Sequence, residues 1–541
     1  MPSVLIVGAG PAGLSLALLL LRNGISVRII DKRTKHFIGA RGAGVMPRTL
    51  ELYKIAGILP AMEHVGNPAP PKIRVYTSPE GGEPINEFHM LERSDPEPSY
   101  YRINALDVLQ DDHQAVLRES LEAEYGVSVE LATELVSFEQ SPEHVTVQLA
   151  KTELGAIETH RFDWVVGTDG ARSAVRKGLG LRFDGDSNAD VLYAIGDIEV
   201  RKTNDDTYWR IWGSVTDKTL ALRPYKRNGK LYYWFFCGGA NIDIHAIEEQ
   251  RDRLVEVMYG VIGKRDIEFG ALVSYGLWRS NIRMVDKFNV GRIFLGGDAA
   301  HVHSFTGAQG VNTSVQDSFN LAWKLALVQK GLAPPSLLDS YSSERVPAVA
   351  GILGKTTAYM HQTFSNMGNK GEGWKRDWTV KQFGINYRRS PIVMDERRTD
   401  VTEPVDPYRS GDDRSARAGD RAPDAPGLML EDGQTKSLFD FFDVTSHTVI
   451  GFGGAFIEAS EKLSCPSGLV KWISVLPAGT ALASASSKGH RAVVDVDGFA
   501  YKHYKVEEAE LLAIVIRPDG YIGAVSKSEA GILAYLKRIL L

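Results

Sequence analysis

Cysteine is scarce in this chain. Two of its 541 residues are cysteines, Cys237 and Cys465. They form no Cys-x-x-Cys motif and no zinc-ligand spacing, so we expect neither a disulfide framework nor a structural zinc. The low cysteine content favours a reducing compartment, and we expect a cytoplasmic location.

Long hydrophobic runs and an excess of one charge are also missing. The apolar stretch at residues 12–21 is too short to span a bilayer, and no basic segment of the signal-peptide type precedes it. The net charge is −5 with a pI near 6.3, which gives no electrostatic case for binding nucleic acid or an acidic membrane. What remains is an ordinary globular composition, long enough for roughly three or four domains.

A glycine-rich turn near the N-terminus is the first positive signal. Residues 4–7 form a short apolar run, typical of a strand buried on both faces. The turn at residues 8–13 follows directly, then an apolar helical run at 12–21 and a second strand at 26–30. This order of strand, glycine loop, helix and strand predicts a dinucleotide-binding site.

Each glycine of the turn has a physical task in such a site. Gly8 allows the tight turn, Gly10 lets a pyrophosphate approach the backbone, and Gly13 lets helix and strand pack closely. The helix N-terminus adds positive potential for the phosphates. Asp31, followed by Lys32, ends the second strand where a carboxylate can bind a ribose. The motif alone does not separate NAD(P) from FAD, and the lack of a second such motif disfavours a reductase with two dinucleotide domains.

Two later segments complete the pattern. Residues 164–167 form a strand that enters the turn Asp169-Gly170. Residues 292–295 form another buried strand, which runs into Gly296-Gly297-Asp298. A carboxylate between glycines at the end of a strand can reach a polyol hydroxyl. The apolar stripe of residues 309–329 predicts a helix whose N-terminus would stabilise negative charge on a reduced flavin.

Together, in this order, the three segments resemble the signatures of single-component FAD-dependent aromatic hydroxylases, the para-hydroxybenzoate hydroxylase superfamily. Residues 303–304, 312–317 and 320–325 are most similar to the phenol hydroxylase-like subgroup. The resemblance implies an α/β fold with α+β elements: a Rossmann-like FAD-binding domain, an interleaved β-sheet substrate domain and a C-terminal thioredoxin-like domain. It also implies FAD as cofactor, NADPH or NADH as transient co-substrate, O2 as oxidant, and a possible homodimer.

The resemblance also implies which residues contact the cofactor. Asp31 holds the adenosine ribose, Arg41 faces the pyrophosphate and Gln110 contacts FAD. Asp169 serves FAD and the incoming nicotinamide cofactor, and Asp298 binds the ribityl chain. The isoalloxazine is backed by the first residues of the late helix, Gly310, Val311 and Asn312.

Some positions depart from the family pattern. Ser304 and Phe305 stand where many relatives have prolines, and Ala308 replaces a frequent glycine. Ala43 stands where phenol hydroxylases have a carboxylate that assists deprotonation. The pattern therefore predicts the flavin but leaves the substrate ring open.

The domain boundaries follow from the resemblance and from composition. Residues 400–427 are rich in Pro, Gly, Asp and Arg, which is typical of a linker. We expect a discontinuous FAD-binding domain at residues 1–185 and 276–395, of which part of 70–105 contributes to the substrate layer. A substrate-binding β-sheet domain is expected at residues 186–275. The linker is expected at residues 396–427, and a thioredoxin-like domain without Cys-x-x-Cys at 428–541.

An aromatic, strand-like region supplies the candidate substrate residues. We expect Arg210, with Tyr225 or Tyr233, to bind and polarise a phenolate. The structural alternative is that the tyrosines belong to the core of the sheet and that the arginine is solvated. His301 and His303 are more typical of structural donors than of a catalytic base. Their spacing could suit metal ligands, but no acidic third ligand is evident, so no metal is expected.

The predicted activity is hydroxylation of a small phenolic substrate by an NAD(P)H-consuming flavin monooxygenase, through a flavin C4a-hydroperoxide, as the resemblance implies. Other enzymes remain open: a flavin halogenase, another flavin oxidoreductase, or a hydroxylase that removes a ring carboxylate anchored by Arg210 or Arg223. A binding protein that kept the fold is disfavoured, because a scaffold needs none of the three aspartates Asp31, Asp169 and Asp298.

Overall fold

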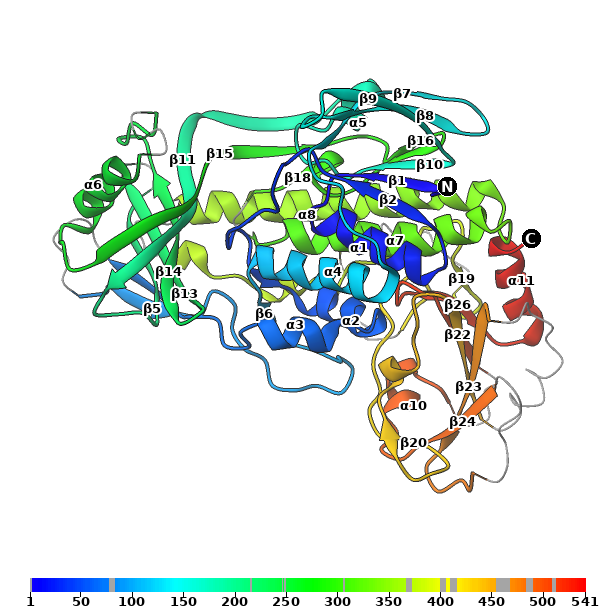
Figure 1. Ribbon diagram of the computed structural model, residues 1–541. Coiled ribbons are helices and arrows are strands. Elements are labelled where there is room, and N and C mark those ends of the chain that lie inside the picture. Colours follow the sequence, from blue (N-terminus) through cyan, green and yellow to red (C-terminus); the bar gives the residue numbers. More distant parts are fainter. Residues whose placement is uncertain are drawn as a thin grey trace.

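A computed structural model describes most of the chain. The described residues are 2–76, 83–214, 217–245, 247, 250–304, 307–365, 372–398, 405–408, 416–453, 468–482, 490–507 and 512–541. Figure 1 shows a central α/β region, a lobe built on a large sheet, and a C-terminal region. Cys465 lies outside the described residues, and Cys237 is a buried free thiol.

The central region is built on a five-stranded sheet of order β16-β17-β10-β1-β2. β1, β2, β10 and β17 run parallel, and β16 pairs antiparallel with β17. β1 and β10 are buried along their whole length, as expected of parallel strands covered on both faces. The strands are β1 (Val4–Val7), β2 (Val27–Ile30), β10 (Trp164–Gly167), β16 (Asn289–Val290) and β17 (Ile293–Leu295).

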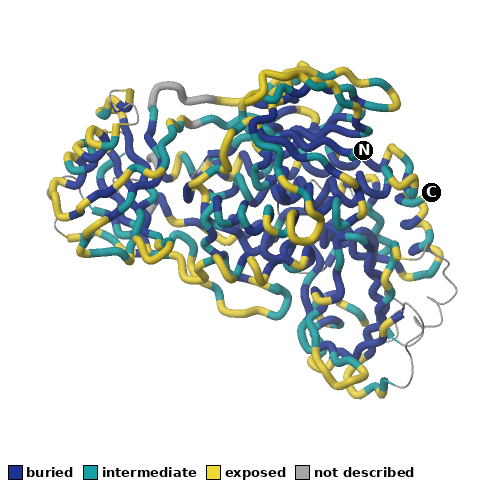
Figure 2. Tube along the Cα trace, viewed as in Figure 1, coloured by how far each residue is buried: buried dark blue, intermediate teal, exposed yellow. Residues whose placement is uncertain are grey.

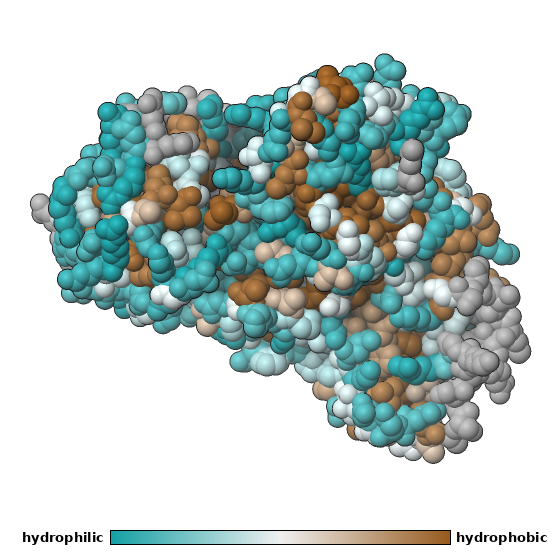
Figure 3. All heavy atoms as spheres, in the orientation of Figure 1, coloured by the Kyte–Doolittle hydropathy of each residue, from teal (hydrophilic) through white to brown (hydrophobic). Residues whose placement is uncertain are grey.

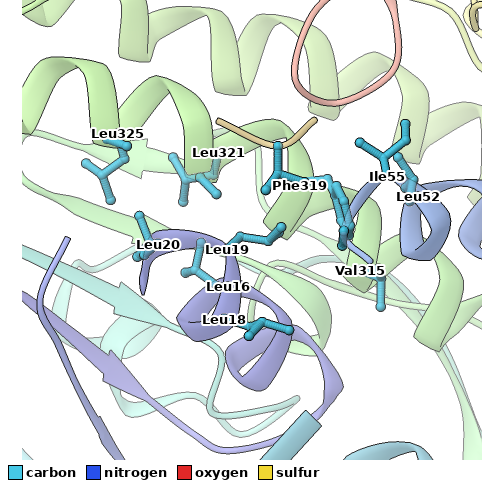
Figure 4. Close-up of a cluster of buried hydrophobic side chains, with 14 of the residues drawn as sticks. Leu16, Leu18, Leu19, Leu20, Leu52, Ile55, Val315, Phe319, Leu321 and Leu325 are labelled. Atoms are coloured by element: carbon cyan, nitrogen blue, oxygen red, sulfur yellow. The ribbon is translucent and has the colours of Figure 1, made fainter. Parts of the chain in front are cut away.

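Helices close the core around this sheet. α1 (Pro11–Arg22) packs against α7 (Gly310–Gln329), and Figure 4 shows leucines of α1 facing Val315, Phe319 and Leu321 of α7, with Leu52 and Ile55 beside them. The sequence predicted both helices to within a residue or two. The other helices of this region are α2 (Pro47–Ile55), α3 (Leu59–Val65), α4 (Gln110–Tyr125), α5 (Ala174–Gly178) and α8 (Asp339–Ser365).

Two small sheets and several 3-10 turns complete the central region. The first sheet is an antiparallel pair, β3 (Gly44–Val45) with β6 (Leu106–Asp107), and the second is β7 (Thr133–Gln140), β8 (Val145–Lys151) and β9 (Ala156–Phe162). The 3-10 turns of the described chain are at Gly297–Ala299, Pro335–Leu338, Glu372–Trp374, Trp378–Lys381 and Leu438–Asp440.

The second lobe is an eight-stranded sheet of order β18-β15-β11-β14-β13-β12-β4-β5. The long strands β11 and β15 connect it to the central region, and α6 lies on its outer side (Figure 1). The elements are β4 (Ile73–Tyr76), β5 (Asn86–Phe88), β11 (Asp184–Lys202), β12 (Trp209–Gly213), β13 (Thr219–Arg227), β14 (Lys230–Gly238), α6 (Arg251–Ile262), β15 (Glu268–Met284) and β18 (His301–Val302).

The C-terminal region has its own sheet, of order β19-β26-β25-β22-β23-β24-β20-β21. Its resemblance to thioredoxin stays a prediction. Its elements are β19 (Met394–Asp395), β20 (Leu428–Met429), β21 (Thr435–Lys436), β22 (His447–Phe452), β23 (Val470–Pro477), β24 (His490–Asp495), α10 (Phe499–Tyr504), β25 (Leu512–Ile516), β26 (Ile522–Ser526) and α11 (Glu529–Ile539).

Buried charges tie the C-terminal region to the rest of the protein. The Arg517 guanidinium donates to the Glu344 carboxylate of α8 at 2.7 and 2.9 Å, and both side chains are fully buried. Arg421 reaches Glu51 of α2 at 3.0 Å. Residues 416–427 of the predicted linker are therefore packed into the protein: Ala418 and Ala422 are buried.

The distribution of burial follows these parts. Figure 2 shows buried residues concentrated along the central sheet and its helices, and exposed residues on the outer loops. In Figure 3 the outer rim of the sheet lobe is hydrophilic, and hydrophobic atoms show nearer the middle of the molecule. Among the described residues, no helix has the length and apolar character needed to cross a membrane.

Candidate functional site

The glycine turn after β1 has the backbone geometry that its sequence predicts. Gly8 has φ +104°, and a Cβ there would lie 2.5 Å from the Thr168 carbonyl oxygen. A Cβ on Gly13 would lie 2.1 Å from the Gly8 oxygen, so a side chain is excluded at both positions. At Gly10, which caps α1 without a side-chain acceptor, a Cβ would meet nothing within 4 Å. Free amides beside open space suit a pyrophosphate.

Asp31 follows β2 directly and its carboxylate contacts this turn. It accepts a hydrogen bond from the Ala9 amide at 3.0 Å and two from the Arg33 side chain at 2.7 and 2.9 Å. Burial opposes ionisation, but the hydrogen bonds of Arg33 outweigh it and lower the pKa of Asp31. A ribose would have to displace Arg33, a contact that the sequence prediction missed. The exposed Lys32 points instead toward Glu134, 4.0 Å away.

Asp298 lies at the surface, within electrostatic reach of Arg41. Asp298 is exposed between the buried residues Gly297 and Ala299. Desolvation by the surrounding protein raises the pKa of its carboxyl group, and the charges of His301 and Arg41 oppose this rise. Arg41 is also exposed, and burial by nearby protein lowers its pKa, against the attraction of Asp298 and Asp197. Arg41 and Asp298 are therefore close enough to influence each other electrostatically, and their roles toward a dinucleotide stay predictions.

A buried ionic network holds the turn that carries Asp298. The Asp317 carboxylate of α7 accepts from the Gly297 amide at 3.0 Å, from His301 Nε2 at 2.7 Å and from Arg345 Nε at 2.7 Å. Burial opposes ionisation, but the charges of Arg345 and His301 lower the pKa of Asp317 to about 2. His301 Nδ1 lies 2.9 Å from Nε2 of His303. This supports the structural interpretation of His301, and no group of three metal-ligating side chains occurs in the described chain.

The N-terminus of α7 begins in open space. A Cβ on Gly310 would meet nothing within 4 Å, and the following Val311 is partly buried. The Asn312 side chain accepts from the Met46 amide at 2.7 Å and donates to the Gly44 carbonyl at 2.9 Å, so it joins α7 to β3. Ala308 has φ +52°, a left-handed conformation that explains why relatives often carry glycine there.

Asp169 and Gln110 complete the predicted cofactor set. Asp169 Oδ2 accepts from the Ala174 amide at 2.6 Å, but its Oδ1 is buried without a partner. Desolvation raises the pKa of Asp169 despite its hydrogen bonds. A buried acceptor beside the Gly8 turn fits a hydroxyl or amide of a dinucleotide. Gln110 begins α4, and its backbone N–H donates to the carbonyl of Ala40 at 3.0 Å. Ala40 is the residue before Arg41.

Two of the three predicted substrate residues lie on the far face of the large sheet. Arg210 Nη2 donates to the Tyr233 hydroxyl at 2.5 Å, and that hydroxyl donates to the Asp205 carbonyl at 2.7 Å. Tyr233 is fully buried in the cluster formed with α6, which includes Leu254 and Met258. The sheet separates both side chains from the face that contacts the Ala40–Arg41 segment through Asp197. This placement argues against a catalytic role for Arg210 and Tyr233.

Tyr225 lies on the opposite face, which faces the central region. Its hydroxyl donates to Asp197 Oδ1 at 3.1 Å, and Asp197 also accepts from the Ala40 amide at 3.2 Å and from the Ser274 hydroxyl at 2.6 Å. Ala40 immediately precedes Arg41, so Asp197 links Tyr225 to the segment that carries Arg41. Asp197 and Arg223, which share this face, have no motif around them, and the sequence prediction missed Asp197.

The cofactor site has counterparts among known proteins. A family model described as "FAD binding domain" matches residues 1–356. A flavin-dependent monooxygenase of Mycobacteroides abscessus is 33% identical over 99% of this chain and 100% of its own length. Pentachlorophenol 4-monooxygenase of Sphingobium chlorophenolicum is 28% identical over 98% of this chain and 94% of its own.

Solved structures share the fold over the whole chain. The flavin-dependent monooxygenase PieE, solved with FAD and substrate, superposes with a TM-score of 0.81 and covers 99% of both chains at 21% identity. At this identity the likeness speaks for the fold alone.

Proposed function

Because the chain belongs to the FAD-binding domain family of flavin-dependent monooxygenases, we propose that it hydroxylates a phenolic ring with O2, using electrons from NADPH or NADH. The predicted family, the FAD cofactor and the mixed α/β fold are confirmed. The phenolic substrate, the nicotinamide cofactor, the oxygen-transferring species and a homodimer stay predictions.

The residues present fit FAD at each end of the site. The open Gly10 turn and the α1 N-terminus would hold the pyrophosphate with Arg41, and the unpartnered Asp169 Oδ1 would accept a cofactor hydrogen bond. Asp298 would hold the ribityl chain, and the N-terminus of α7 would stabilise negative charge on the ring. FAD supplies the redox chemistry that activates O2, and the protein supplies binding, orientation and electrostatics.

The observation that carries the proposal is the Tyr225–Asp197 pair, which contacts the Ala40 amide next to Arg41. The Tyr225 hydroxyl donates to Asp197, so its lone pair remains free to accept the proton of a phenol. Burial and the Asp197 carboxylate raise the pKa of Tyr225, so its hydroxyl stays protonated. It would relay a proton by accepting one from the phenol while it donates its own to Asp197. Burial raises the pKa of Asp197, which favours uptake of that proton. A deprotonated phenol is electron-rich enough for hydroxylation.

Absorbance and product analysis test this proposal together. Purified protein should show a flavin spectrum, and substituted phenols should stimulate NADPH or NADH consumption. Under labelled O2, the product mass should rise by one labelled oxygen atom. A flavin-loaded protein that consumes the nicotinamide cofactor but yields only hydrogen peroxide with every phenol tried would contradict the proposal.

A further inference from the structure

A chain of three buried glutamine side chains stands at the N-terminus of α7. Gln316 Nε2 donates to Gln382 Oε1 at 2.5 Å, and Gln382 Nε2 donates to Gln309 Oε1 at 2.6 Å. Gln309 Nε2 then donates to the backbone carbonyls of Gly307 and Val380, at 2.7 and 3.1 Å. Each of the three glutamines is at most 2% exposed. The chain therefore links the segment around Val380 to the loop that enters α7.

The backbone fixes the orientation of every amide in this chain. A carbonyl oxygen can only accept, so the contacts of Gln309 Nε2 with two carbonyls turn its Oε1 toward Gln382. At the other end, Gln316 Nε2 also donates to the Asn312 carbonyl at 3.3 Å, so its donor group also faces Gln382 Oε1. Gln382 must therefore present a donor on one side and an acceptor on the other, which a neutral amide does.

The backbone conformation of Gln382 is unusual for its residue type. Its φ is +65°, in the left-handed region where glycine is the usual residue. It follows the 3-10 turn Trp378–Lys381 directly and caps its C-terminal end. Glycine would relieve the strain but would break the glutamine chain at its centre. A glutamine at this strained position indicates that the hydrogen bonds of its side chain are needed.

Gln309 occupies the position from which a side chain would cap α7. It is the N-cap residue, but it makes no capping hydrogen bond, because its amide is turned to Gly307, Val380 and Gln382. In the described chain, the first backbone N–H groups of α7 thus have no side-chain cap. Released from Gln382, the Gln309 side-chain oxygen would be free to turn to these N–H groups. Gln382 therefore keeps the positive end of the helix available to a bound group.

We propose that Gln382 is a positioning residue for the flavin: through Gln309 it keeps the N-terminus of α7 uncapped, and this raises the reduction potential of bound FAD. The reduced flavin ring carries more negative charge than the oxidised ring, so an uncapped helix N-terminus favours the reduced form. The inference rests on the place at α7 that the proposed function gives to the flavin ring. It does not depend on the aromatic substrate.

The reduction potential of the FAD-loaded protein, measured by equilibration with a redox dye, tests the proposal. Q382M keeps the bulk of the side chain and removes both of its hydrogen bonds. It should bind reduced FAD about tenfold more weakly, relative to oxidised FAD, than the wild type does, which corresponds to a potential about 30 mV more negative. Q316M should give a smaller shift, because it leaves the contact between Gln382 and Gln309 in place.

A double variant tests whether Gln382 acts through Gln309. In a Q309M background, Q382M should cause no further change in potential, because the side chain that transmits its effect is absent. A full shift in that background would overturn the inference. Q382G suits the left-handed backbone and gives a second variant without the side chain, in case Q382M does not fold; its shift should match that expected for Q382M.

Q329M is the matched control, since Gln329 lies at the other end of α7 and its side chain also joins other segments, through Trp164 and Asp163. Its potential should equal that of the wild type. An unchanged potential in a folded, FAD-loaded Gln382 variant would overturn the inference, and so would an equal shift in Q329M.

The inference and the proposed function can fail separately. If Q382M weakens the binding of oxidised and reduced FAD equally, the potential does not change, and the inference fails while the proposed function stands. If the wild type oxygenates no phenol but Q382M shows the expected shift, the proposed function fails and the role of Gln382 toward FAD remains.

Discussion

The two faces of the eight-stranded sheet carry similar residues with opposite roles. Each face has a buried arginine beside a tyrosine and at least one tryptophan. On the α6 face, Arg210 donates to Tyr233, which itself donates to the backbone carbonyl of Asp205, and one Arg210 nitrogen, Nε, is buried without a partner. On the central face, Arg223 leaves two buried nitrogens unpartnered, and the Tyr225 hydroxyl donates to Asp197. Residue type therefore does not identify the working face.

What separates the faces is the packing partner. The α6 face is closed by Leu254, Met258 and other apolar side chains of a helix that belongs to the lobe itself. The central face meets the cofactor region through Ala40 and Asp107. We therefore expect substitutions on the α6 face to change stability and substitutions on the central face to change activity.

The largest stability effect is expected for F235A on the α6 face. Phe235 is fully buried in that cluster, and its truncation should lower the free energy of unfolding of the lobe by about 3–5 kcal/mol. Denaturant unfolding followed by tryptophan fluorescence measures the change, and FAD content at low temperature is the control. Loss of FAD from F235A at low temperature, together with an unchanged free energy of unfolding of the lobe, would contradict the proposed difference between the two faces.

The largest activity effect is expected for Y225F on the central face. Loss of the hydroxyl interrupts proton transfer to Asp197, so kcat should fall on the order of 10²-fold. The matched variant is Y233F, which removes the same atom on the other face and should leave kcat within about twofold. Steady-state kinetics with a phenol decide this, and equal losses in both variants would show that the faces do not differ.

A smaller effect is expected for S274A in the pH profile. The Ser274 hydroxyl donates to Asp197 at 2.6 Å and opposes the rise in the pKa of Asp197 that burial causes. Without it the pKa of Asp197 should rise further, so the acid limb of kcat should move to higher pH, by about one unit or less. A limb that moves to lower pH, or stays in place, would remove Asp197 from the proton path.

The smallest effect is expected for K32A, outside the sheet. The Lys32 side chain is 64% exposed and lies near Glu134 rather than Asp31. FAD affinity, measured by titration of the apoprotein, should change less than about twofold. A much larger loss would restore the cofactor role predicted from the sequence.

The sequence predicted the cofactor region well because its signals are local. A glycine at positive φ, an apolar strand and a helix that starts after glycine depend on neighbours in the chain, so 12–21 and 309–329 closely matched α1 and α7. The linker was judged by composition, and its burial depends on contacts with Glu51 and other distant groups. The hydrogen bonds from Arg33 to Asp31 depend on the conformation of the Arg33 side chain, which the spacing of residues in the sequence does not indicate.

By itself, the sequence determined the family, the FAD cofactor and the aspartates at the strand ends, because these follow from short motifs in a set order. Only the tertiary structure decided that Tyr225 and Arg223, rather than Tyr233 and Arg210, face the cofactor region. Strand alternation places residues on two faces, but the register between strands and the choice of which face packs against the FAD-binding region arise from contacts between segments far apart in the chain.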